Sequence, residues 1–182
     1  LIADGYIAVE AQDGQGVKNV GKDIINLAKK LNVSQSVLGR GNSISDFAEN
    51  NDWSALREEL EATQNEVKLS MAEQKDNDLI ILVSVGAWVR GTEAASLFIS
   101  KNYSPGLAGL LRQPAIVEYL LAEVNRLPEK LAAQPLIVQL RERLAAVLPI
   151  VQTGDRAPLT PEAVAELAAS MTSLVNSISG GA

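Results

Sequence analysis

The feature that most constrains the fold is the 11-residue run from Leu79 to Val89, which is uncharged and apolar on every side of a helix. A membrane-spanning helix needs about 20 such residues, and Arg90 and Glu93 interrupt this run too early. A helix that is apolar all round is typical of a protein core. The sequence therefore predicts residues 79–100 as a central helix, with a buried strand as the minority interpretation for the first part of this segment.

Apolar residues recur at the three- and four-residue spacing of helices through most of the chain. Asp52 is a predicted N-cap, and prolines 114, 135 and 161 suit the first turn of a helix. Prolines 128 and 149 are expected to end two of these helices. The predicted fold class is all-α: a single-domain bundle of about six or seven helices around the central one.

Glycines suggest where helices are interrupted. Residues 1–16, which end in Asp13-Gly-Gln-Gly16, are expected to form a flexible N-terminal arm or a short docking strand. Gly39 and Gly41 likewise predict a connection over residues 34–42. The predicted bundle domain covers residues 17–182.

The chain contains no histidine and no cysteine. This removes thiol nucleophiles, Ser/His/Asp triads, iron–sulfur clusters and the usual zinc sites. Carboxylate, lysine, arginine, tyrosine and hydroxyl chemistry is left. We predict no catalytic residue, no metal site and no cofactor from the sequence.

The formal net charge is −6, and residues 46–78 hold 10 acidic and three basic side chains. Such a negative field repels phosphate backbones and anionic lipid headgroups. Nucleic acid is therefore not an expected partner, and no transmembrane span is expected in this chain.

Two motifs have ordinary structural interpretations. Gly16-Val-Lys-Asn-Val-Gly-Lys-Asp23 has the glycine and lysine spacing of a phosphate-binding loop, but an aspartate replaces the hydroxyl residue and the segment has a helical pattern. Glu59, Glu66 and Glu73 are seven residues apart and align along one helix edge. Either they face a divalent cation or a basic partner, or they form a solvated helix face, which we favour.

The candidate ligand-binding residues are Trp88, Arg90 and Glu93, within the most apolar predicted helix. Arg90 and Glu93 are three residues apart, so we predict an ion pair, with Glu59 or Glu66 as other possible partners of Arg90. Gly86 and Gly91 weaken a helix, which requires compensation. In one hypothesis they admit a neighbouring helix or a ligand that Arg90 and Trp88 hold; in the favoured one, the helix reaches the surface at Arg90.

The leading functional hypothesis is a non-enzymatic, exported domain of bacterial type that binds a small ligand or a partner protein. Because the chain begins at Leu1, we expect a removed signal peptide and a periplasmic or extracellular location. The alternatives are a carboxylate- or metal-dependent hydrolase or lyase, and a structural assembly subunit.

Overall fold

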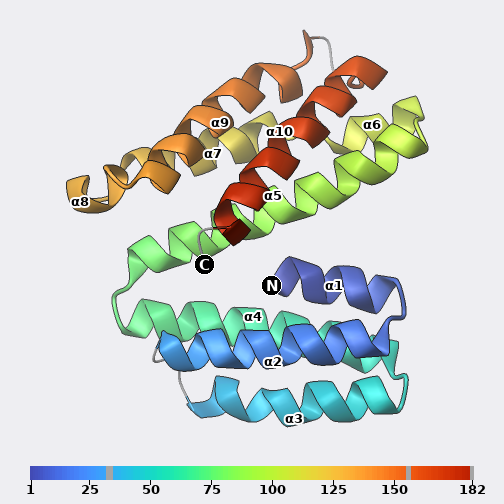
Figure 1. Cartoon of the computed structure of the whole chain (residues 1–182), viewed down its shortest axis with the longest axis vertical. Coiled ribbons are helices and arrows are strands. Elements are labelled where there is room, and N and C mark those ends of the chain that lie inside the picture. The colour runs from blue at the N-terminus through green and yellow to red at the C-terminus, as the bar shows by residue number, and fades with distance from the viewer. Residues whose placement is uncertain (32–34, 155–156, 181–182) are drawn as a thin grey trace. The chain divides into compact units, whose positions relative to one another are not determined.

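A computed structural model of the chain describes residues 1–31, 35–154 and 157–180. No β-strand occurs among these residues, so the prediction of an all-α helical bundle is confirmed (Figure 1). The helices divide between two compact units, residues 1–80 and 81–182, which we call unit 1 and unit 2. The sequence pattern predicted one domain over residues 17–182 and did not indicate this division.

Unit 1 is a bundle in which α2 packs against α1 and α3, and α4 packs against the same two helices (Figure 1). The bounds are α1 (Ile2–Glu10), α2 (Gly14–Lys30), α3 (Gln35–Glu49) and α4 (Trp53–Glu73). Burial of apolar side chains holds such helices together. The buried cluster of unit 1 consists of Ala8, Val9, Val17, Ile44, Ala48, Leu56 and Leu60.

The prediction of a flexible arm over residues 1–16 is wrong, because this segment contains α1 and the start of α2. Gly5 lets α1 approach α4 closely, since a Cβ atom at that position would lie 3.2 Å from Leu60 Cδ2. Gly16 lies in the first turn of α2, where its N–H donates to Asp13 Oδ1 at 2.9 Å. The glycines thus serve close packing and a helix start.

Three turns of unit 1 share one geometry. In each, a helix ends at a residue with positive φ, and the N–H of the following aspartate donates to a carbonyl five residues earlier, as in a Schellman motif. The positive-φ residues are Gln12, Asn51 and Lys75, and the N–H groups of Asp13, Asp52 and Asp76 each donate at 2.9 Å. Asp52 Oδ1 also accepts from the Ala55 N–H at 3.1 Å, which confirms the predicted N-cap.

The prediction of a connection over residues 34–42 is also wrong from residue 35 onward, because α3 runs through both glycines; Ser34 lies outside the described residues. A Cβ atom at Gly41 would lie 3.0 Å from Ile25 Cγ1 of α2. Glycine is therefore needed for the close approach of α2 and α3, and that packing outweighs its low helix propensity.

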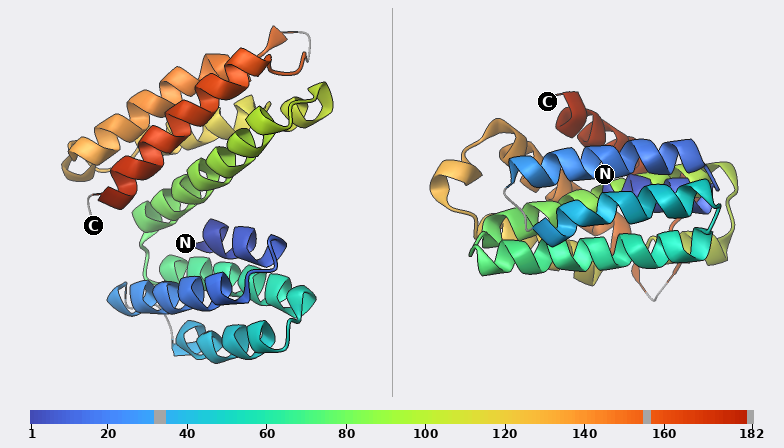
Figure 2. Two further views of the ribbon diagram at one scale, coloured as in Figure 1. Left: turned by 45° about the vertical axis from the view of Figure 1, so that its right-hand side comes forward. Right: turned by 90° about the horizontal axis from the view of Figure 1, so that it is seen from below.

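Unit 2 contains most of α5 together with the remaining helices. Their bounds are α5 (Asn77–Lys101), α6 (Pro105–Leu110), α7 (Pro114–Asn125), α8 (Glu129–Ala132), α9 (Pro135–Val151) and α10 (Pro161–Gly180). Helix α9 packs against both α7 and α10 (Figure 2). Prolines 114 and 135 open helices as predicted, whereas Pro149 lies inside α9 instead of ending it.

Helix α5, which corresponds to the central helix predicted over residues 79–100, is buried along one face and not on all sides. By length and composition, α5 is long and apolar enough to cross a membrane. Of its most apolar 18-residue window, 28% is buried inside the structure. Its buried positions form one stripe: Val85, Val89, Thr92, Glu93, Ser96 and Ile99. On other sides, Leu97 and Phe98 keep 40% and 59% of their surface exposed.

Candidate functional site

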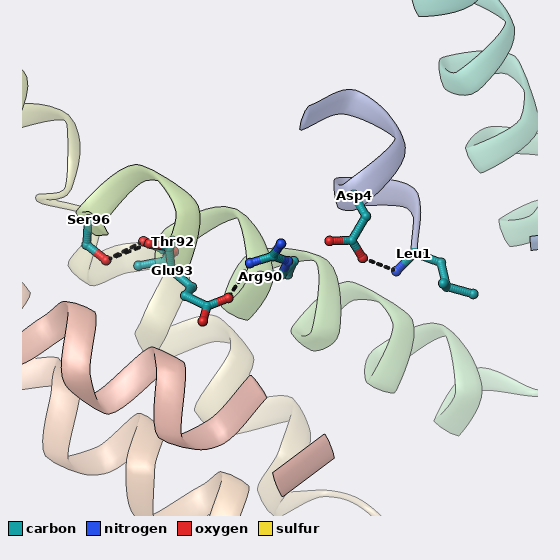
Figure 3. A network of polar contacts seen from close by, with 6 residues as sticks. All are labelled: Leu1, Asp4, Arg90, Thr92, Glu93 and Ser96. Carbon is teal, nitrogen blue, oxygen red and sulfur yellow. Dashed lines mark hydrogen bonds and ion pairs between the residues drawn. The ribbon is translucent and has the colours of Figure 1, made fainter. Parts of the chain in front are cut away.

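The predicted ion pair of the candidate site is confirmed: Arg90 Nη1 donates to Glu93 Oε2 within α5 (Figure 3). The Glu93 side chain is only 6% exposed, while that of Arg90 is 34% exposed. A buried carboxylate needs such a countercharge, because removing it from water is costly. The arginine thus reaches from a more exposed position to neutralise the buried acid.

Trp88 has a separate set of contacts. Its ring packs against the apolar cluster of unit 2, and its indole Nε1–H donates to Gln113 Oε1 at 3.0 Å. Gln113 is the N-cap residue of α7, so this bond ties α5 to the start of α7. Trp88 bonds to Gln113 and Arg90 pairs with Glu93, in line with positions two apart that do not face one another on a helix. Ligand binding by Trp88, Arg90 and Glu93 stays a prediction.

Hydroxyl groups near Glu93 bond to the backbone of α5 itself. Ser96 Oγ donates to Thr92 O at 2.7 Å (Figure 3), and Ser100 Oγ donates to Ser96 O at 2.8 Å. Bonds of this kind let polar side chains lie in a helix interior or on its buried face. They explain why a helix with buried threonine and serine positions is stable in unit 2.

Two residues of the acidic row in α4 have a basic partner inside unit 1. Arg40 of α3 donates from Nη1 to Glu59 Oε1 at 2.9 Å and from Nε to Glu66 Oε2 at 2.5 Å. These hydrogen bonds raise the pKa of Arg40 above its ordinary value, and the bond to Glu59 contributes more than the bond to Glu66. Glu73 is exposed. Sequence reasoning missed Arg40 because it assigned residues 34–42 to a connection.

The other candidate motifs have no ligand-binding geometry. The segment with phosphate-loop spacing is helical throughout, within α2, as the sequence analysis favoured. Among the described residues, no group of three or more acidic side chains is placed to hold a metal ion.

A feature that sequence reasoning missed is an open groove of about 890 Å³ between α5 and α10 in unit 2. Its lining is uncharged and mostly small, and Thr172 Oγ1 is buried there without a hydrogen-bond partner among the described residues. The sequence signal was the repeat of small residues every three or four positions along α10. The groove is lined by Leu97, Ser100, Ala165, Ala168, Ala169, Thr172, Ser173, Asn176 and Ser177.

No protein-family model matches the chain, and neither a curated protein nor a solved structure is significantly similar to it.

Proposed function

We propose that this chain is a non-catalytic helical protein that binds a helix of a partner protein in the α5/α10 groove. The observation that carries the proposal is an uncharged groove with exposed apolar side chains beside it. Recognition of this kind, in which a helix lies in a groove between helices, is common in protein complexes.

The shape of the groove supports a helix over an enclosed small molecule. Its volume of about 890 Å³ lies within the usual range for ligand sites. Small-molecule sites, however, bury most of the ligand surface, whereas this groove is open along α10. Small lining residues such as Ala165 and Ala169 allow the ridge of another helix to approach the backbone closely.

The side chains that line the groove indicate which side chains the partner presents to it. Because no charged side chain lines the groove, a charge carried into it by a partner would lose its water without gaining a countercharge there. Leu97, which lines the groove, exposes apolar surface that a partner would cover. The expected contact face is therefore uncharged, with apolar and hydroxyl side chains.

A neutral apolar dye, N-phenyl-1-naphthylamine, tests whether the groove accepts such a surface. We expect its fluorescence to rise with the wild-type chain, and NMR shifts to concentrate in residues 97–100 and 165–177. Ala169→Arg should weaken dye binding at least about tenfold. The matched control is Ala122→Arg, at an exposed position of α7 outside the groove lining.

Circular dichroism of both variants verifies that the helices are retained. Equal dye binding by wild type and Ala169→Arg, or NMR shifts confined to other surfaces, would contradict the proposal. Export to the periplasm or the cell surface stays a separate prediction, which fractionation of cells expressing the full gene would test.

A further inference from the structure

We infer that the partner helix belongs to a second copy of this chain, so that two copies pair through their α5/α10 grooves. This inference rests on the proposed function and adds the identity of the partner. It is carried by the charge distribution between the two units and by the side chains on both sides of the groove.

The net charge of the chain lies entirely in unit 1. Residues 1–80 contain 14 acidic and eight basic residues, a net charge of −6, whereas residues 81–182 contain eight of each. A net charge well away from zero keeps proteins apart, and a value near zero permits association. A contact made through unit 2 therefore joins two units with no net charge, whereas a contact through unit 1 would join two units that each carry −6.

The residues that line the groove carry no charge. No residue from 167 to 180 of α10 is charged, and the acidic residues of this helix, Glu162 and Glu166, lie in its first turns. Two α10 helices can therefore approach along their own uncharged turns; the nearby guanidinium of Arg143 in α9 is held by a hydrogen bond from Nη2 to Ser173 Oγ at 3.4 Å.

The groove carries both a ridge and a recess, which a symmetric pair requires. In a two-fold pair the same patch occurs on both sides, so it must be complementary to itself. Leu97 of α5 is 40% exposed and borders a recess made of small residues such as Ala165 and Ala169. Leu97 of one copy can thus enter the small-residue recess of the other.

Sedimentation equilibrium of the full chain, at concentrations from about 1 μM to about 1 mM, tests the inference. This range detects dimers whose Kd lies between these concentrations. We expect the mass to rise with concentration towards twice that of one chain. Ala169→Arg places a charge in both copies of the contact and should raise the Kd of the dimer at least about tenfold. Ala122→Arg, the same change outside the groove, should dimerise like wild type.

A wild-type chain that stays monomeric throughout this range would overturn the inference, and so would a dimer that Ala169→Arg leaves unchanged. The dye experiment shows whether such a result contradicts only the dimer or also the proposed binding of a partner helix in the groove. Dye binding in the groove of a monomeric chain would contradict only the second copy as partner. Absence of both dye binding and dimerisation would contradict both proposals.

Discussion

The guanidinium of Arg40 in α3 lies 2.9 Å from the carboxylate of Glu59 in α4, and the same guanidinium also binds Glu66. All three side chains are less than a third exposed: 30% for Arg40, 15% for Glu59 and 24% for Glu66. One arginine thus pairs with two carboxylates that lie two helical turns apart on α4. The pairing fixes α3 against α4 in unit 1.

Arg40→Met should lower the free energy of unfolding by about 1–3 kcal/mol, because two partly buried carboxylates each lose a charge-assisted hydrogen bond. Urea denaturation measures the loss. The matched control is Arg57→Met, since the Arg57–Glu10 pair is 50% and 63% exposed. Its expected loss is below about 1 kcal/mol, as for other surface pairs. Equal losses in the two variants would contradict a special role for Arg40.

Arg90→Met should destabilise the chain by about 3 kcal/mol, because Glu93 is then a buried carboxylate without the countercharge it has in the structure. The double variant Arg90→Met/Glu93→Leu should recover most of this loss, since apolar side chains can replace a buried ion pair. Urea unfolding of the single and double variants decides between the outcomes. If Arg90→Met were neutral, the ion pair would have no structural role.

Gly91→Ala should stabilise the chain by about 0.5–1 kcal/mol, because glycine in a helix interior costs about that much relative to alanine. An added Cβ atom meets nothing within 4 Å at Gly91. At Gly41 it would meet Ile25 at 3.0 Å, so Gly41→Ala should gain less or lose stability. Thermal unfolding of the two variants provides the comparison, and a larger gain for Gly41→Ala would contradict the close approach of α2 and α3.

Burial, followed by repulsion from Glu61, raises the pKa of the Tyr6 hydroxyl above its ordinary value of 10.0. A group whose pKa is higher in the folded state stabilises that state below the unfolded pKa, and this contribution disappears as pH rises through the folded pKa. Wild type should therefore lose stability relative to Tyr6→Phe above about pH 10. Urea unfolding between pH 9 and about 11 tests this, with Tyr119→Phe, at an exposed tyrosine, as control.

The candidate site shows where sequence reasoning succeeds and fails. The Arg90–Glu93 pair was predictable because residues three apart on a helix are neighbours whatever the rest of the fold does. Arg40 is 19 and 26 residues from its two partners, so no local pattern indicates those contacts. The groove was missed for the same reason, since α5 and α10 meet only through the packing of unit 2.

The sequence by itself determined most of the helical segments and where several of them begin, because N-caps, first-turn prolines and apolar periodicity act within a few residues. Asp52 and Pro135 are examples. The tertiary structure alone decided that the glycines of α3 lie within a helix and that α5 keeps apolar surface exposed. It also decided that the chain has two units. Burial depends on which helices meet, and those contacts join residues far apart in the chain.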